Sequence, residues 1–390
     1  MNINDYIYLD NAATTKIKKK VLDSMIPHLE SNFGNPSSLY SFGQESRNSI
    51  EESREKISTI LHSKPSEIIF TSGGTEANNL AILGSSYAMK DFGNHIITSS
   101  IEHHAVLHPC EELEKEGFEV DYLPVDKFGL VSPKDLKNAI KPNTILVSIM
   151  MANNEIGTIQ DMNNLIKVVR EKQDSNNLIL FHSDAVQSLG KMEINLKNMD
   201  VDLLSVSGHK INGPKGIGAL FVRRGTPLRP IIFGGGQEKQ LRSGTENVAA
   251  IVGFAEALFL AESERENFNE KCTNLRDKLS NRILELIPQS FLNGHPTERL
   301  SNIVNISFDG VEGEPILVGL DLAGIYASSG SACSSGSLDP SHVLISTGLN
   351  PKLALGSIRF SLSPSNSEEE IFYVVKELSK IIKTLREMAS

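Results

Sequence analysis

Residues 68–79 read IIFTSGGTEANN, and the organisation of the whole chain is first visible in this stretch. The run IIFT predicts a short buried strand, Ser72-Gly73-Gly74 a tight turn, and the pattern over 75–89 a helix. The first backbone N–H groups of such a helix have no partner within the helix, so they favour an anion such as a phosphate. An ordinary strand–helix turn with Thr75 as the helix cap is the alternative interpretation.

Short apolar strands alternate with helices on both sides of this stretch. The predicted strands are residues 68–71, 96–99, 120–124, 144–151, 178–183, 203–207 and 218–222. The predicted helices between them are residues 75–89, 106–116, 133–140 and 161–173. Strands that are apolar throughout and separated by helices are typical of an α/β fold, with a mostly parallel sheet covered on both faces.

The chain is too long for one ordinary domain of about 100–200 residues. A heavily charged helical pattern covers about residues 251–286, and strands at 303–308 and 358–362 with a helix at 367–388 follow it. We expect residues 15–260 to form a large α/β domain. Residues 1–14 and 261–390 are expected to form a smaller α+β domain.

Composition and charge exclude several classes of protein. With 39% hydrophobic and 22% charged residues, the 390-residue chain can build a large core. A net charge of −10 disfavours a dedicated nucleic-acid or anionic-membrane binder. No apolar run reaches the roughly 18 residues of a membrane span, and no signal peptide precedes the first strand. Three cysteines cannot build a disulfide framework, so we expect a cytoplasmic enzyme. We also expect no metal site in this chain.

Two further segments place polar side chains where a strand ends. Lys210 follows the strand 203–207 among small and turn-forming residues, which is a suitable environment for a Schiff-base amine. Asp184 follows the strand 178–183, at the edge where open α/β sheets bind ligands. An aspartate there could keep a pyridinium nitrogen protonated. A solvated surface lysine and an aspartate that caps a helix are the respective alternatives.

Another polar segment is SSGSACSSGS, residues 328–337, which carries a single thiol at Cys333. Cysteine usually packs as a small apolar residue, so a cysteine among serines and glycines is better explained as a nucleophile. Cys110 and Cys272 lie within helical patterns, where packing is the expected role.

The ordered set of motifs resembles the NifS/IscS-type cysteine desulfurases, which are aminotransferase class V, fold type I pyridoxal phosphate enzymes. The resemblance runs over about residues 8–387. It rests on YLDNAATT (8–15), FGNPSS (33–38), TSGGTEANN (71–79), EHHAV (102–106), NNEIG (153–157), SGHKINGPKGIGAL (207–220), RSGTEN (242–247), SSGSAC (328–333) and SIRFS (357–361). The resemblance implies a fold type I architecture, a large sheet domain that binds the cofactor, and a small domain that carries the catalytic cysteine.

The resemblance also implies a role for individual residues. The expected catalytic residues are Lys210 as the Schiff-base lysine, Asp184 as partner of the pyridine nitrogen, His103 as acid/base that stacks on the ring, and Cys333 as sulfur acceptor. Pyridoxal 5'-phosphate would further be bound by Gly74, Thr75, Asn154, Gln187, Ser207 and His209, and by Thr245 from the partner subunit of a homodimer. The substrate would be bound by Asn35, Asn154 and Arg359.

By this resemblance the protein converts L-cysteine to L-alanine and passes the sulfur, held as a persulfide on Cys333, to an acceptor protein. Iron–sulfur cluster assembly, tRNA thiolation and DNA phosphorothioation remain open as destinations of the sulfur. The alternatives are a selenocysteine lyase, another fold type I enzyme such as an aminotransferase, or a non-catalytic scaffold or thiol sensor. A transaminase has no use for the Cys333 thiol, and a scaffold has none for Lys210 and Asp184.

Overall fold

The computed structural model describes residues 6–173, 177–329 and 339–389. Its strands are β1 (Ile7–Tyr8), β2 (Ile68–Thr71), β3 (His95–Ser99), β4 (Glu119–Leu123), β5 (Thr144–Ser148), β6 (Leu180–Asp184), β7 (Leu203–Ser207), β8 (Gly218–Val222), β9 (Ser290–Asn293), β10 (Ile303–Phe308), β11 (Ile325–Tyr326) and β12 (Ser357–Ser361). Its α-helices are α1 (Lys19–Glu30), α2 (Ser41–Ile60), α3 (Gly74–Met89), α4 (His104–Lys115), α5 (Pro133–Ala139), α6 (Met162–Lys172), α7 (Val248–Ser263), α8 (Arg265–Leu286), α9 (Gly313–Leu322), α10 (His342–Ser346), α11 (Pro351–Leu355) and α12 (Glu368–Ala389).

A seven-stranded sheet forms the centre of the large lobe, in the order β2-β8-β7-β6-β5-β3-β4. The adjacent strands β4, β3, β5, β6 and β7 pair in parallel with one another. The strand β8 runs antiparallel to both of its neighbours, β7 and β2. The prediction of a mostly parallel sheet is therefore confirmed. The carboxyl ends of the parallel strands meet at one edge, which is where an open α/β sheet positions a ligand.

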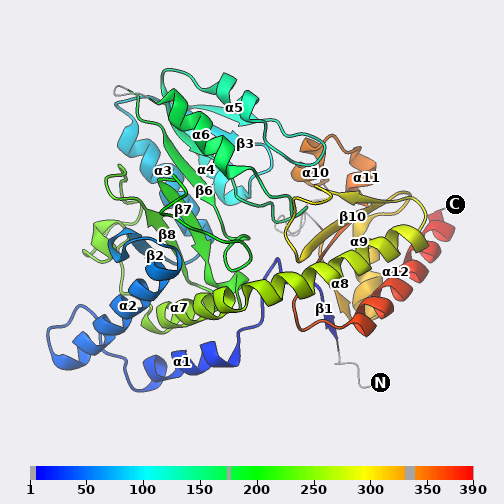
Figure 1. Ribbon diagram of the computed structural model, residues 1–390, viewed down its shortest axis with the longest axis horizontal. Helices are drawn as coiled ribbons and strands as arrows, with labels where there is room; N and C mark the ends of the chain where they lie inside the picture. The colour runs from blue at the N-terminus through cyan, green and yellow to red at the C-terminus, as the bar shows by residue number, and fades with distance from the viewer. Residues whose placement is uncertain (1–5, 174–176, 330–338, 390) are drawn as a thin grey trace.

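Both faces of this sheet are covered by helices, because its strands are apolar on both sides (Figure 1). Phe70, Phe181 and Phe221 pack on one face with α2, α6 and α7. Their chain neighbours Ile69, Leu180 and Leu220 point to the other face, which α3 and α4 cover. Successive side chains of a strand alternate between faces, so a strand buried on both sides is mostly apolar, and the polar residues of β6 and β7 lie toward their carboxyl ends.

The small lobe contains a three-stranded antiparallel sheet in the order β12-β10-β9, with α8 and α9 packed against it and α12 packed on these two helices. It has a hydrophobic core of its own, to which Ile7 and Leu9 from the start of the chain contribute. β1 pairs in parallel with β11, which fixes the start of the chain to the small lobe. A boundary at residue 260 between two folding domains stays a prediction.

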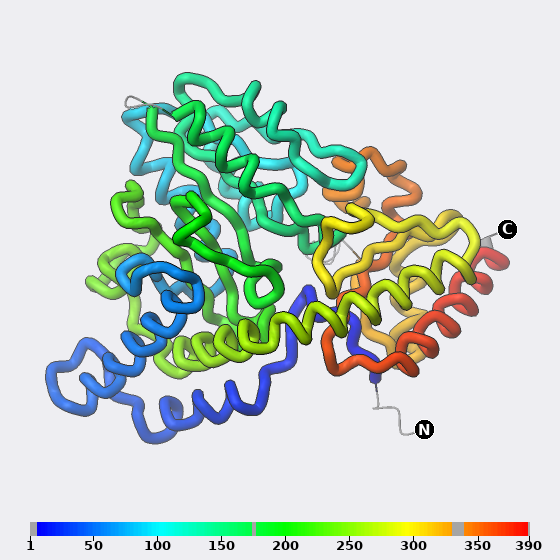
Figure 2. The backbone as a smooth tube through the Cα atoms, in the orientation of Figure 1, coloured from blue at the N-terminus to red at the C-terminus, as the bar shows by residue number. Residues whose placement is uncertain are grey.

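The connection between the lobes differs from the single helix predicted over 251–286. Two helices, α7 and α8, meet at Glu264, whose ψ of 1° departs from helical geometry. Figure 2 shows them nearly in line from one lobe to the other. The charge of the α8 sequence suggested one continuous solvated helix, whereas α7 is buried in the large lobe and α8 packs on the small one. No helix of the described residues has the length and hydropathy needed to span a membrane.

Candidate active site

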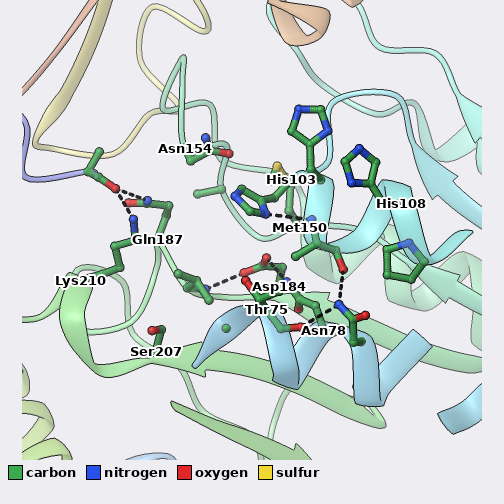
Figure 3. A pocket seen from close by; sticks show the side chains of 18 of the residues that line it. Thr75, Asn78, His103, His108, Met150, Asn154, Asp184, Gln187, Ser207 and Lys210 are labelled. Atoms are coloured by element: carbon green, nitrogen blue, oxygen red, sulfur yellow. Dashed lines mark hydrogen bonds between the residues drawn. The ribbon is translucent and has the colours of Figure 1, made fainter. Parts of the chain in front are cut away.

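A cavity of about 980 Å³ opens where β6 and β7 end and α3 and α4 begin. Side chains of both lobes line it, because Arg359 of β12 reaches it from the small lobe. Ten of the thirteen candidate residues from the sequence line this cavity: Gly74, Thr75, His103, Asn154, Asp184, Gln187, Ser207, His209, Lys210 and Arg359. Segments that are far apart in the sequence are thus brought to one place (Figure 3).

Three candidate residues are not among those that line the cavity. Asn35 is exposed, and its side-chain oxygen accepts a hydrogen bond from the backbone N–H of Ser37 at 2.9 Å. Thr245 is also exposed on the surface of the chain. Cys333 lies outside the described residues. The roles of all three stay predictions.

The start of α3 forms one end of the cavity and has the chemistry of an anion site. Gly73 is the N-cap residue and no side chain caps the helix, so the interpretation of Thr75 as an ordinary cap is wrong. The Ser207 hydroxyl lies at the same end, is buried, and has no hydrogen-bond partner within the described chain. Uncapped N–H groups, a helix dipole and an unpartnered buried hydroxyl together favour an anion with several acceptor oxygens.

Gly74 packs tightly at this end. A Cβ atom at Gly74 would lie 2.7 Å from Cγ2 of Val186, so a larger side chain cannot fit without a shift of the chain. His209 lies nearby, and its Nδ1 is 3.2 Å from the Thr14 hydroxyl. Burial, together with the positive charges of Lys210 and Lys215, lowers the pKa of His209 to about 4. His209 is therefore neutral at pH 7 and can donate one hydrogen bond without adding charge.

Asp184 is the last residue of β6 and is 7% exposed. Its carboxylate accepts hydrogen bonds from Nδ2 of Asn78 at 2.6 Å and from the backbone N–H of Val186 at 2.9 Å. A turn follows Asp184 and no α-helix does, so the interpretation as a helix cap is wrong. Two donors hold the Asp184 side chain at the cavity wall, where a carboxylate can balance a cation.

Lys210 ends the 3₁₀ turn Gly208–Lys210 that follows β7. It is half-buried, and its Nζ donates to the carbonyl oxygens of Ala12 and Ala13, both at 2.6 Å. The interpretation of Lys210 as a solvated surface lysine is therefore wrong. Figure 3 shows it beside Gln187, whose Nε2 donates to the same Ala12 carbonyl at 3.0 Å.

His103 is the N-cap residue of α4, and its Nδ1 accepts a hydrogen bond from the backbone N–H of Ala105 at 3.0 Å. Burial lowers the pKa of His103 below its usual value of 6.5. The neutral ring must then carry its proton on Nε2, because Nδ1 acts as an acceptor. This tautomer leaves Nε2 as a donor to whatever the cavity binds.

Arg359 is 3% exposed in β12, and its two terminal nitrogens already have partners in the chain. Nη2 donates to Oδ1 of Asp10 at 2.8 Å and Nη1 to the backbone carbonyl of Asn154 at 2.9 Å. Its Nε is buried without a partner in the described chain. The sequence analysis quoted Asp10 within a motif but gave it no role. Asp10 orients a guanidinium that has donors left for a carboxylate.

Comparison with known proteins identifies one family over nearly the whole chain. The aminotransferase class-V family matches residues 7–374. The cysteine desulfurase IscS of Methanosarcina thermophila is 50% identical over 386 residues, covering 99% of this chain and 94% of that protein. The chain belongs to the class-V aminotransferases, as a cysteine desulfurase of the NifS/IscS type.

Two solved structures support the same placement among the cysteine desulfurases. A NifS-like protein superposes with a TM-score of 0.91 at 38% identity, covering 97% of this chain and 100% of that one. The structure of SspA in complex with cysteine superposes with a TM-score of 0.81, also at 38% identity, covering 93% of this chain and 100% of that one. The fold type I architecture expected from the motifs is thereby confirmed.

The desulfurases of this family depend on pyridoxal 5'-phosphate, and the cavity fits that group. The uncapped start of α3 and the unpartnered Ser207 hydroxyl suit its phosphate. The Asp184 carboxylate suits a protonated ring nitrogen, and Lys210 supplies an amine from the same cavity wall. The cofactor prediction is thus confirmed at the level of the family, and the residue roles remain for a proposal.

Proposed function

We propose that this cavity is the active site in which the protein takes the sulfur from L-cysteine and releases L-alanine. The observation that carries the proposal is the meeting of Lys210, Asp184 and Arg359 in one cavity. An amine, a carboxylate and a guanidinium are the groups needed to bind a pyridoxal cofactor and an amino-acid carboxylate together.

The cofactor would be held mainly by residues of the large lobe. Gly74, Thr75, Ser207 and His209 would bind the phosphate, and Asp184 would pair with the ring nitrogen. His103 would stack on the ring, and Asn154 and Gln187 would contact it, with Gln187 reaching the phenolic oxygen. Lys210 would hold the cofactor covalently. When bound there, pyridoxal phosphate supplies an electron sink for the bond at the substrate Cα that breaks.

The protein's own groups would bind the substrate and move its protons. The Arg359 guanidinium, oriented by Asp10, would bind the substrate carboxylate, with Asn35 and Asn154 beside it. Lys210 Nζ would take the proton from Cα, and His103 Nε2 would exchange a proton with the substrate thiol. Cys333 would then receive the sulfur as a persulfide.

Outside the active site, we propose a homodimer in which Thr245 of each subunit serves the phosphate site of the other. The exposure of Thr245 on its own chain supports this arrangement. We further propose a cytoplasmic enzyme that hands its sulfur to an acceptor protein and binds no nucleic acid itself, which the net charge of −10 supports. The acceptor would belong to iron–sulfur cluster assembly, tRNA thiolation or DNA phosphorothioation.

The direct test is product analysis with the purified protein, pyridoxal phosphate and a thiol reductant. We expect L-cysteine to yield L-alanine and sulfide in equal amounts, and L-serine to yield neither. The same assay with L-selenocysteine measures the alternative activity. Formation of a keto acid from L-cysteine without sulfide would identify an aminotransferase and contradict the proposal.

A further inference from the structure

Lys191 is a buried lysine beside the active site to which neither the motifs nor the proposed mechanism gives a role. It lies in the turn that follows β6 and is 6% exposed. Its Nζ donates to the backbone oxygen of Gln187 at 3.0 Å and to Oε1 of Gln187 at 3.3 Å. Its backbone carbonyl accepts a hydrogen bond from Nδ2 of Asn269 in α8, which fixes the turn to the helix that links the lobes.

No carboxylate of the described residues lies within 4.0 Å of the Lys191 amine. The charged or ionisable groups around it are Lys210, Arg359 and the thiol of Cys272. Burial, with the two neighbouring cations, lowers the pKa of Lys191 to about 7. An amine buried without a counter-ion costs stability, so Lys191 is better explained by a task other than stabilising the fold.

The hydrogen bonds around Gln187 fix which way its amide faces. The protonated Lys191 amine has only donors, so in that form the amide oxygen has to face Lys191. A backbone carbonyl only accepts, so the amide nitrogen has to face Ala12, to which Nε2 donates at 3.0 Å. The flipped amide would set donor against donor at Lys191 and oxygen against oxygen at Ala12.

We propose that Lys191 is a positioning residue that holds Gln187 in the cavity as a hydrogen-bond donor. Gln187 and Ala12 both line the cavity, and Nε2 has a second N–H beyond the one bound to Ala12. That N–H is the donor that the phenolic oxygen of the cofactor would accept. The inference rests on the proposed function, because the contact between Gln187 and the cofactor is itself proposed.

The test is a double-mutant cycle on the holoenzyme, read from the visible absorbance of the bound cofactor as a function of pH. A donor to the phenolic oxygen favours its ionised form, so removing that donor raises the midpoint of the spectral titration. We expect Gln187→Ala and Lys191→Met each to raise the midpoint, by up to about one pH unit. The double variant should shift no further than Gln187→Ala alone, because Lys191 acts through Gln187.

Controls separate this role from a structural one. Lys18→Met removes a lysine from the same region that does not contact Gln187, and it should leave the midpoint unchanged. Lys191→Arg keeps a donor and should restore the midpoint toward wild type, whatever it does to the melting temperature. Lys191→Leu provides a second removal variant if Lys191→Met does not fold.

Two results would overturn the inference, and they differ. In the first result, Gln187→Ala shifts the midpoint, but Lys191→Met either does not shift it or shifts it by the same amount when Gln187 is already alanine. Lys191 then does not act through Gln187, and the proposed contact between Gln187 and the cofactor stands. If Gln187→Ala itself leaves the spectrum unchanged, the contact between Gln187 and the cofactor is wrong, and the role of Lys191 falls with it.

Discussion

At the scale of single residues, the proposed function gives Lys210 two tasks that no other amine in the cavity wall can take over. It lines the cavity with its Nζ held by Ala12 and Ala13. We expect Lys210→Ala to abolish turnover and the yellow colour of the covalently held cofactor, because both the covalent link and the proton acceptor are lost. Absorbance of the purified variant and alanine release measure this. A variant that kept the spectrum of the wild type would contradict the assignment.

Asp184 acts through its charge, and an asparagine of the same size removes that charge. We expect Asp184→Asn to retain the cofactor but to lower kcat by about a hundredfold to a thousandfold, since an amide cannot stabilise a protonated ring nitrogen. The Val186 N–H can still donate to the remaining oxygen, and the Asn78 amide can turn its unpartnered Oδ1 toward the new NH2 group, which should preserve the fold. Alanine production near the wild-type rate would reduce Asp184 to a structural residue.

The three cysteines allow a matched comparison. Burial raises the pKa of the Cys110 thiol far above its usual range and that of Cys272 to about 12, so neither forms a thiolate near pH 7. We expect Cys333→Ser to stop sulfur release while the cofactor still responds spectrally to L-cysteine. Cys110→Ser and Cys272→Ser should keep sulfur release. Mass spectrometry without reductant should find one added sulfur on the peptide of Cys333. Finding it on either buried cysteine would rule out this route.

At the scale of elements, the turn between β3 and α4 positions His103 and contains a buried carboxyl group. Oε1 of Glu102 accepts from the Ser99 hydroxyl at 2.7 Å and from the backbone N–H of Met150 at 2.8 Å. Burial raises the pKa of Glu102 from its ordinary 4.5 to about 8. The folded protein therefore keeps a proton that the unfolded chain has lost between these two values. The contribution of Glu102 to stability is full below pH 4.5 and falls as the pH rises through 8.

Substitution by glutamine tests this pH dependence. Glu102→Gln keeps the oxygen that accepts both hydrogen bonds but cannot ionise. We expect the melting temperature of the wild type, relative to that of Glu102→Gln, to fall between pH 6 and pH 9 by about 2 °C or more. Part of the dependence of the melting temperature on pH should remain in Glu102→Gln, because burial also raises the pKa of Glu155, to about 7. Equal slopes for both proteins would contradict the raised pKa.

Most elements of the large sheet could be predicted from sequence, because a strand buried on both faces is mostly apolar. The strand 68–71 was predicted with the bounds that β2 has. The predicted helix over 106–116 begins two residues earlier as α4, at His104, because His103 acts as its cap. The sequence analysis named neither α1 nor α2, since their surfaces are largely polar and their packing partner α7 is distant in sequence.

At the scale of the whole molecule, the proposed homodimer makes each active site depend on two chains. Lys210→Ala should inactivate the site of its own chain, and Thr245→Asp should repel the phosphate from the site that Thr245 serves. If Thr245 acts on the partner, a mixed dimer of the two variants contains one intact site. Co-expression should then restore about a quarter of the wild-type activity, given random pairing. No restoration in an isolated mixed dimer would place Thr245 in its own subunit's site. An active Thr245→Asp homodimer would show that Thr245 serves neither site.

The sequence by itself determined the α/β class, the family and ten residues of the cavity wall. The α/β class, Lys210 and Asp184 could be read locally, because a buried strand, a glycine turn and a lysine or aspartate at a strand end each lie within about ten residues. The family and residues such as His103, Gln187 and Arg359 followed instead from the resemblance of the ordered motifs over the whole chain. Tertiary structure alone decided how these groups act on each other. Asp10 meets Arg359 across most of the chain, and the amide of Gln187 meets the Ala12 carbonyl from a segment far away in the sequence. Such contacts depend on distances and burial in three dimensions, which no local pattern contains.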